Sequence, residues 1–319
     1  MSLLDKPIVM SPSTSMPLAS LRKASKRYGK LTALDGIDLQ VNAGEVLAVL
    51  GANGAGKSTA LGLLTGRLGP DAGEVELFGG DPRDPAIRRG IGVMLQEGNL
   101  PDTLRVAEHV RLFSTYYPSP RLLAETLARA GIEDIAHRPY GELSGGQQRR
   151  VQFALAICGR APLLFVDEPT VGLDVESRRN FWRVLRQLRD EGTGIVLTTH
   201  YLEEADALVD RVVLLAAGRV LAEDTPAGIK SRAAGKRVRA RSGIPVEQIT
   251  LWPETNSVQA SEGVVEVRSA DVEGLLRRWL LADASLSELE VRALNLEEAF
   301  LSLTAPIAQA AGNTTEQFA

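Results

Sequence analysis

A glycine-rich loop, GANGAGKST, occupies residues 51–59 between an apolar stretch and a helical pattern. Its spacing is G-x-x-x-x-G-K-[ST], in which glycines turn backbone N–H groups onto phosphate oxygens and the lysine reaches the outer phosphates of a nucleotide. The Ser58 hydroxyl is placed to ligate Mg²⁺. A glycine-rich turn without a ligand is the alternative, and the strand, lysine and hydroxyl together argue against it. The loop residues expected at the nucleotide are Gly51, Ala52, Asn53, Gly54, Ala55, Gly56, Lys57, Ser58 and Thr59.

Two carboxylates follow the apolar stretch in LLFVDEPT, residues 163–170. Ligands of parallel α/β sheets bind beyond the C-terminal ends of the strands, so both acids are expected near the phosphates. Asp167 can hold Mg²⁺ through water, and Glu168 is placed to polarise an attacking water. A strand that ends in two acids merely for solubility is the alternative, which the neighbouring phosphate loop disfavours.

Three further side chains are candidates for the same site. His200 ends the stretch GIVLTTH and Gln96 ends IGVMLQ, so both are expected at that edge of the sheet. The histidine could contact the γ-phosphate and the water, although a lone histidine is more often structural. Gln96 could touch Mg²⁺ and the water, a weak signal by itself. Tyr28 precedes a glycine and could stack on adenine, or could be an ordinary tyrosine at a strand edge.

A second anion-binding pattern occurs in LSGGQQRR, residues 143–150. A serine and two glycines open a helical run, and the N–H groups at a helix start can hold phosphate. The Ser144 hydroxyl and the N–H groups of Gly145 and Gly146 are the donors, and no lysine accompanies them. We therefore expect these residues to cover a γ-phosphate already bound by the lysine of a second copy, in a head-to-tail pair.

Short apolar runs that alternate with helical patterns must position these residues. The runs at 46–51, 91–96, 162–168, 194–200 and 211–223 are rich in β-branched residues and predict a buried, mostly parallel sheet. The segment ALDGIDLQVNAGE, which starts at Ala33, alternates with period two and predicts a hairpin in an antiparallel β subdomain. The fold class is therefore α/β.

The pattern divides the chain into four parts. Residues 1–19 and 306–319 are expected to be flexible tails, residues 20–228 an α/β domain, and residues 229–305 a small α+β domain. Within the first domain, the β-branched runs vanish over about 97–147, which predicts an α-helical insertion. The basic run from Lys230 to Arg241 is either a solvated strand edge or a surface for anionic lipid headgroups.

Composition limits the classes of function. The 319 residues carry a net charge of −4, which disfavours nucleic acid as a partner. The single cysteine, Cys158, excludes an internal disulfide framework and lies in an apolar helical stretch typical of a core. No apolar run reaches the roughly 18–20 residues that a membrane-spanning helix needs.

The whole set of motifs resembles, in order and spacing, the ATPases of ATP-binding cassette (ABC) transporters over about Leu21 to Lys230. The resemblance implies a P-loop NTPase fold and two bound Mg-ATP shared by two chains. Val171 departs from the serine found in many members, without an evident functional loss. Carried over by position, the family's roles fall on Tyr28 (adenine stacking), Gln96 (coupling to the transmembrane partner), Ser144, Gly146 and Gln147 (the motif acting on the partner's ATP), Asp167 (Mg²⁺), Glu168 (catalytic base), His200 (switch) and Asp174 (the loop that links the two sites).

The C-terminal pattern LNLEEAFLSLT, residues 294–304, resembles the end of ATPases that serve drug, antibiotic and lipid exporters of the daunorubicin-resistance kind. The resemblance implies an ATP-hydrolysing subunit that dimerises on ATP and drives a separate permease from the cytoplasmic face of the membrane. The role of the C-terminal domain stays open between sensing and dimerisation. The alternative function is a soluble ABC ATPase acting on ribosomes or DNA. Such proteins usually carry two cassettes or long coiled coils, and neither pattern occurs here.

Overall fold

The computed structural model describes residues 16–96, 98, 100–199, 206, 208–232 and 235–304. The described chain forms two compact units that divide between Glu223 and Asp224. None of the helices in these ranges combines the length and apolar composition needed to cross a membrane.

A six-stranded sheet forms the centre of the first unit, in the order β5-β6-β7-β3-β8-β9. Its strands are β3 (Val46–Leu50), β5 (Ile91–Met94), β6 (Leu163–Asp167), β7 (Gly194–Thr198), β8 (Arg211–Ala216) and β9 (Arg219–Asp224). The first five of these pair in parallel, which confirms the predicted α/β fold. The predicted β run over 211–223 contains two strands, because Ala217 and Gly218 adopt positive φ angles of 48° and 75° and turn the chain between β8 and β9.

A separate three-stranded antiparallel sheet, in the order β2-β1-β4, forms the predicted β subdomain. It contains β1 (Ala19–Tyr28), β2 (Leu31–Val41) and β4 (Ala72–Leu77). The hairpin lies between β1 and β2, not within residues 33–45 as the sequence pattern suggested. Gly36, with φ of 61°, sits inside β2 beside an irregularity of the β1–β2 register instead of making a turn. A bulge thus replaces the expected turn.

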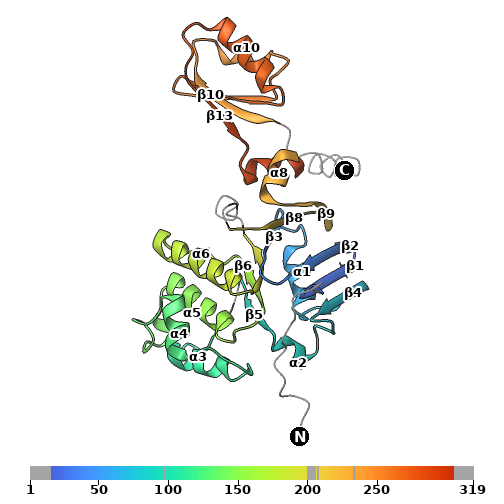
Figure 1. The fold of residues 1–319 in the computed structure, drawn as a ribbon, viewed down its shortest axis with the longest axis vertical. Helices are drawn as coiled ribbons and strands as arrows, with labels where there is room; N and C mark the ends of the chain where they lie inside the picture. The colour runs from blue at the N-terminus through green and yellow to red at the C-terminus, as the bar shows by residue number, and fades with distance from the viewer. Residues whose placement is uncertain are drawn as a thin grey trace. The chain divides into compact units, whose positions relative to one another are not determined.

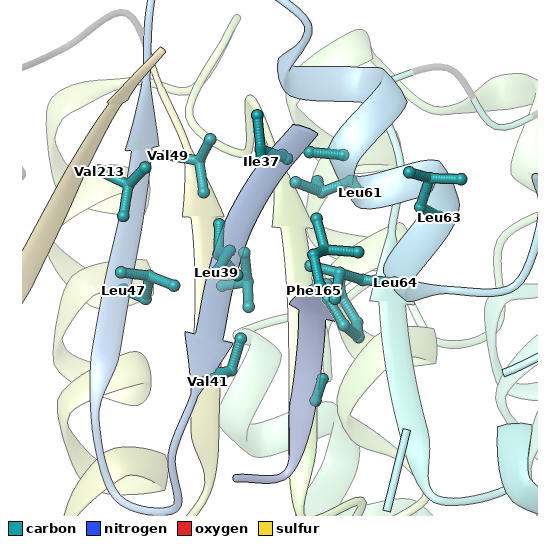
Figure 2. Close-up of a cluster of buried hydrophobic side chains, with 14 of the residues drawn as sticks. Ile37, Leu39, Val41, Leu47, Val49, Leu61, Leu63, Leu64, Phe165 and Val213 are labelled. Carbon is teal, nitrogen blue, oxygen red and sulfur yellow. The ribbon is translucent and has the colours of Figure 1, made fainter. Parts of the chain in front are cut away.

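The main core lies between the two sheets and α1 (Lys57–Leu64), the helix that follows the phosphate loop. All five residues of β3 are buried, as expected for a parallel strand covered on both faces. Figure 2 shows Leu61 and Leu64 of α1 pointing toward Phe165 of β6. The helix that carries Lys57 is therefore fixed against the strand that carries Asp167.

Most remaining helices of the unit gather away from α1 and the antiparallel sheet (Figure 1). These elements are α3 (Val106–Ser114), α4 (Leu123–Ala130), the 3₁₀ turn η1 (Tyr140–Glu142), α5 (Gly145–Ile157) and α6 (Val175–Asp190). The short helix α2 (Pro85–Arg88) lies apart from them, and its Ile87 packs against the main core. The predicted helical insertion over 97–147 contains α3, α4 and the first turn of α5. Because α5 continues to Ile157 and packs on β5, it joins the insertion to the central sheet.

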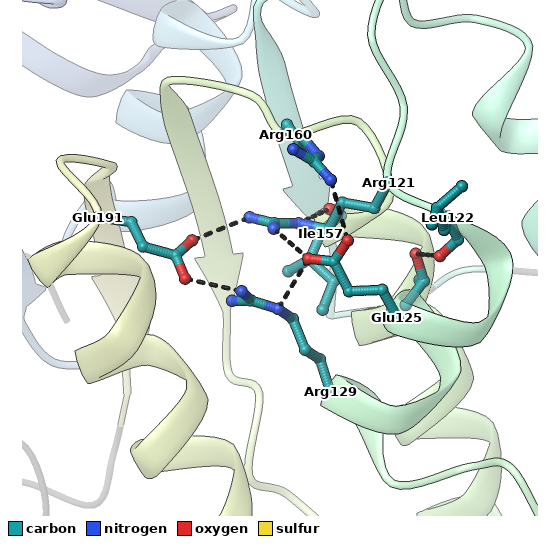
Figure 3. A network of polar contacts seen from close by, with 8 residues as sticks. Arg121, Leu122, Glu125, Arg129, Ile157, Arg160 and Glu191 are labelled. Carbon is teal, nitrogen blue, oxygen red and sulfur yellow. Dashed lines mark hydrogen bonds and ion pairs between the residues drawn. The ribbon is translucent and has the colours of Figure 1, made fainter.

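An ion-pair network ties α4 to the ends of α5 and α6 (Figure 3). Arg121 Nη1 and Arg160 Nη2 lie 2.9 Å from the two carboxylate oxygens of Glu125. Arg129 Nη2 lies 2.7 Å from Glu191, which Arg121 also contacts at 3.3 Å. Networks that share partners in this way hold their geometry better than isolated surface pairs.

The second unit contains a four-stranded antiparallel sheet in the order β11-β12-β10-β13. Trp279, fully buried, and Trp252 lie with ring centroids 6.1 Å apart in its core. Residues 296–304, within the predicted C-terminal pattern, are helical. The named elements are α8 (Pro226–Arg232), β10 (Lys236–Arg241), α9 (Val246–Thr250), β11 (Ser257–Ser261), β12 (Val264–Ser269), α10 (Val272–Ala282) and β13 (Ser287–Ala293).

Candidate nucleotide-binding site

One pocket of about 240 Å³ brings together most of the side chains that the sequence singled out. It lies where β1, β2, the phosphate loop and the C-terminal ends of β5 and β6 meet. Its lining also includes two residues of β2 that sequence reasoning missed, Leu31 and Ala33. The predicted residues that line it are Tyr28, Asn53, Gly54, Gly56, Lys57, Ser58, Thr59, Gln96, Asp167 and Glu168.

The phosphate loop has its shape because glycine is required where it touches its neighbours. Gly56 is the N-cap of α1 with φ of 107°, and a Cβ there would lie 2.6 Å from the carbonyl oxygen of Ala33. A Cβ on Gly51 would lie 2.5 Å from the carbonyl oxygen of Leu215. Gly51, Ala52 and Ala55 are not among the described lining residues, so they shape the loop behind the pocket wall.

Lys57 is the cation of this pocket. Its Nζ donates hydrogen bonds to the carbonyl oxygens of Gly51 at 2.7 Å and Ala52 at 3.2 Å. Burial lowers the pKa of Lys57, and the nearby carboxylates Glu168 and Asp167 act in the opposite direction. The ammonium group is thus held within the loop that should carry phosphates, facing the two acids.

The two acids are fixed through the adjacent strand β7. Thr198 Oγ1 donates a hydrogen bond to Asp167 Oδ1. The Glu168 N–H donates to the carbonyl oxygen of Thr198 at 3.1 Å and to its hydroxyl at 3.2 Å. Glu168 is only 3% exposed and has φ of 47°, which is uncommon for a residue other than glycine. Such a conformation persists only where its surroundings hold it, and it often marks a functional site.

The donors in the pocket fit a magnesium ion that is shared with phosphates. Ser58 offers a hydroxyl, Gln96 an amide oxygen and Asp167 a carboxylate, and all three line the same pocket. Mg²⁺ prefers oxygen ligands and is usually held by only one or two carboxylates, with phosphates and waters completing its shell. This sparse oxygen set suits that ion better than zinc, which takes nitrogen and sulfur ligands.

An apolar pair forms one end of the pocket. Tyr28 and Leu31 are direct partners across the β1–β2 hairpin, and their side chains are 47% and 66% exposed. Two large apolar side chains left open beside a phosphate loop can receive a flat aromatic base. The sequence could have indicated Leu31, because a short hairpin turn at residues 28–31 places Leu31 opposite Tyr28.

The predicted second anion site begins α5. Ser144 is its N-cap, and Ser144 Oγ accepts a hydrogen bond from the Gln147 N–H at 3.3 Å while Gln147 Oε1 accepts from the Ser144 N–H at 3.0 Å. This capping box uses Ser144 Oγ as an acceptor, so the hydroxyl proton can still be donated outward. None of Ser144, Gly145, Gly146 and Gln147 is among the described residues that line the Lys57 pocket.

The loop before α6 lies beside this helix start. A Cβ on Gly146 would be 3.0 Å from the carbonyl oxygen of Gly172. Asp174 caps α6 by accepting from the Ser177 N–H and Oγ, both at 2.8 Å, and these bonds hold its pKa below the usual value. His200, the remaining predicted residue, lies outside the described residues.

The model of the family described as ABC transporter matches residues 34–171. The chain is similar to a daunorubicin resistance ATP-binding protein of Streptomyces coeruleorubidus, with 36% identity over 299 residues that cover 88% of this chain and 94% of that protein. It is also similar to a Nod factor export ATP-binding protein of Rhizobium sp. (strain N33), with 37% identity over 294 residues that cover 89% and 96%.

Solved structures resemble it as well. An ATP-binding subunit of an ABC transporter matches with a TM-score of 0.64 and 28% identity, covering 67% of this chain and 92% of its own. A dimeric ATP-binding cassette in a post-hydrolysis state, bound to ADP and Pi, matches with a TM-score of 0.60 and 29% identity, covering 65% and 98%.

Proposed function

Since this chain belongs to the ABC transporter family and is one of its ATP-hydrolysing subunits, we propose that two copies bind two Mg-ATP at a shared face and drive a separate export permease. The observation that carries the proposal is the division of phosphate donors over two places. Lys57 and the two acids share one pocket, whereas the Ser144 donors lie outside it. A head-to-tail pair brings both sets to each nucleotide.

Within such a pair, the residues of the pocket divide the binding and the hydrolysis of ATP among them. Tyr28 and Leu31 receive the adenine, the phosphate loop and Lys57 bind the phosphates, and Glu168 takes the proton of the attacking water. Ser58, Gln96 and Asp167 would hold Mg²⁺, which supplies charge neutralisation on the β- and γ-phosphates when bound.

The partner's Ser144 loop completes the site. The Ser144 hydroxyl and the N–H groups of Gly145 and Gly146 donate to the γ-phosphate oxygens, where negative charge develops. Asp174 and His200 are proposed at the dimer face and at the γ-phosphate, respectively.

Mixing two inactive variants tests the shared site. Ser144→Ala and Glu168→Gln should each hydrolyse ATP poorly alone. When they are mixed in equal amounts before ATP is added, a mixed dimer has one site with Glu168 from one chain and Ser144 from the other. Half of the dimers are mixed and half of their sites are intact, so roughly a quarter of the wild-type rate should return. Mixtures that stay as inactive as their parts contradict a site shared between chains.

A second measurement follows the assembly itself. Glu168→Gln should bind Mg-ATP without hydrolysis and accumulate as a dimer of about twice the 34.3 kDa of one chain. Light scattering after gel filtration measures this mass. A monomer at saturating Mg-ATP would oppose the proposal, and the matched control is the same variant without nucleotide, which should stay a monomer.

Export through a separate permease is supported by the family and by exposed apolar side chains at the end of α3. Leu112 of α3 and Tyr116, which follows the helix, are exposed, and the Phe113 and Tyr116 rings lie 6.0 Å apart. Exposed apolar side chains that lie together mark interaction surfaces. The two similar proteins are named for daunorubicin resistance and for Nod factor export, which favours a drug, antibiotic or lipid-like substrate.

Purification from native membranes tests this assignment. The wild-type chain should co-purify with an integral membrane protein, as expected for a subunit that is bound to its permease at the cytoplasmic face of the membrane. A variant with Leu112→Ser and Tyr116→Ser should lose that partner and keep ATP binding. Recovery of ribosomal proteins in place of a membrane protein would favour the soluble alternative.

A further inference from the structure

Arg149 lies at the junction of the elements that build the site, within the stretch LSGGQQRR, and no role has been assigned to it so far. It belongs to α5, between one and two turns after Ser144, and is 8% exposed. Burial lowers the pKa of its guanidinium, and Asp167, Tyr140 and Glu168 act in the opposite direction. Burial of a guanidinium is unfavourable unless its donors are hydrogen-bonded. The groups that accept these hydrogen bonds therefore indicate what the side chain does.

Those partners are main-chain carbonyl groups at two strand ends. Arg149 Nη2 donates to the carbonyl oxygens of Asp167 at 3.1 Å and Glu168 at 2.5 Å. Nη1 donates to the carbonyl oxygens of Leu95 at 2.7 Å and Gln96 at 3.0 Å. One planar side chain from α5 therefore binds the backbone that carries both acids and the backbone that carries Gln96.

A neighbouring side chain of the same helix supports this arrangement. Gln152 Oε1 accepts from Arg149 Nη1 at 2.7 Å, which orients the guanidinium. Gln152 Nε2 donates to the carbonyl oxygen of Gly98 at 3.2 Å and to the Tyr140 hydroxyl at 3.2 Å. The segment after β5 is thus bound to α5 at the carbonyl groups of Leu95, Gln96 and Gly98.

The effect on Glu168 follows from its backbone. Its N–H is bound by Thr198 of β7 and its carbonyl oxygen by Arg149 of α5. Both peptide groups that flank the unusual φ of 47° are therefore held by hydrogen bonds. Removal of one holder frees the residue to relax toward ordinary backbone angles and to turn its carboxylate away.

We propose that Arg149 is a positioning residue that aims Glu168 and Gln96 at the attacking water by binding the main-chain carbonyl groups beside them. This proposal rests on the proposed role of Glu168 as the general base. Arg149 is not among the described residues that line the pocket, and both of its Nη atoms already bind main-chain carbonyl groups, so we expect it to make no contact with the nucleotide. Its loss should therefore slow hydrolysis and leave ATP affinity intact.

The test compares kcat with ATP affinity in the full chain. Arg149→Ala should reduce kcat roughly 100-fold, the effect of a misplacement near 1 Å, while the Kd for Mg-ATP changes by less than about twofold. Guanidinium chloride, at concentrations that leave the fold intact, should restore part of the rate in this variant. Urea, which has a similar shape and no charge, should not.

Arg121 provides the matched control. It is also 8% exposed, and it also donates to a main-chain carbonyl, that of Ile157 at 3.1 Å, but at the other end of α5 (Figure 3). Arg121→Ala should lower the melting temperature comparably and keep kcat. Arg149→Lys is the second variant, since it keeps the charge and packing but cannot span both strand ends, and it should also lose kcat at an unchanged Kd.

The outcomes separate the two proposals. If Arg149→Lys or Arg149→Ala retains the wild-type kcat while Glu168→Gln is inactive, the positioning role is overturned and the general base stands. If Arg121→Ala loses as much kcat as Arg149→Ala, the effect is a general one of buried arginines and the positioning role is again overturned. A Glu168→Gln variant with wild-type kcat removes the proposed base, and the role of Arg149 with it.

Discussion

Ser144 serves two purposes that substitution can separate. Its Oγ accepts from the Gln147 N–H and thereby caps α5, and its hydroxyl proton is proposed to reach the partner chain's γ-phosphate. Alanine removes both functions. Glycine removes the hydroxyl but remains an acceptable N-cap residue, whereas threonine keeps the hydroxyl and a weaker cap.

The expected magnitudes differ between the two purposes. Loss of an N-cap side chain costs about 1 kcal/mol of stability with alanine and only a few tenths with glycine. Loss of one donor to a developing oxyanion lowers kcat by roughly 10²- to 10³-fold, or about 3 to 4 kcal/mol. Ser144→Ala should therefore melt at a lower temperature than Ser144→Gly, while both lose a similar part of kcat.

Phosphate release at saturating Mg-ATP measures kcat, and calorimetry of the same samples gives the melting temperature. Ser144→Thr is the control, because its hydroxyl should retain most of the rate. A Ser144→Gly variant with a kcat near that of the wild type would refute the reasoning, since the hydroxyl would then have no part in hydrolysis. A kcat that falls in proportion to the melting temperature across the three variants would also refute it, because loss of the helix cap would then explain both effects.

Three further results are expected. Lys57→Ala should weaken Mg-ATP binding by roughly 10- to 100-fold in calorimetric titration, because a charged donor to phosphate is lost; unchanged affinity would contradict the loop assignment. Tyr28→Ala should weaken ATP binding by about 1 to 3 kcal/mol because the stacking on adenine is lost, whereas Tyr28→Trp should retain the wild-type affinity. An affinity of Tyr28→Ala equal to that of the wild type would exclude stacking. Asp283 accepts bonds from Ser285, Ser242 and the Gly243 N–H, which hold its pKa far below 3.8. The carboxylate therefore stabilises the second unit above about pH 4 and loses this effect as the pH falls further. In scanning calorimetry Asp283→Asn should lower the melting temperature at pH 7 and differ progressively less in acid, and a constant difference would contradict the assignment.

Local patterns in the sequence sufficed for the phosphate loop and for the strands that carry the acids. The spacing of Gly51, Gly56 and Lys57 is a local pattern, and Lys57 Nζ binds the nearby carbonyl groups of Gly51 and Ala52. Buried parallel strands are continuous apolar runs, which are equally visible along the chain. The close approach of Gly51 and Gly56 to the distant residues Leu215 and Ala33 came only from the fold. The hairpin prediction failed where Gly36 makes a bulge inside β2, because the same glycine suits a bulge and a turn and only strand pairing decides between them.

The tertiary structure alone decided how distant segments meet. Leu31 and Ala33 line the pocket because the β1–β2 hairpin folds beside the phosphate loop, and no local pattern in the sequence indicates that the hairpin lies there. Arg149 reads as one more helix residue in the sequence, and only the packing of α5 on β5 and β6 brings its guanidinium to four carbonyl groups. Main-chain carbonyl groups carry no residue identity, so the sequence cannot indicate which side chain will bind them.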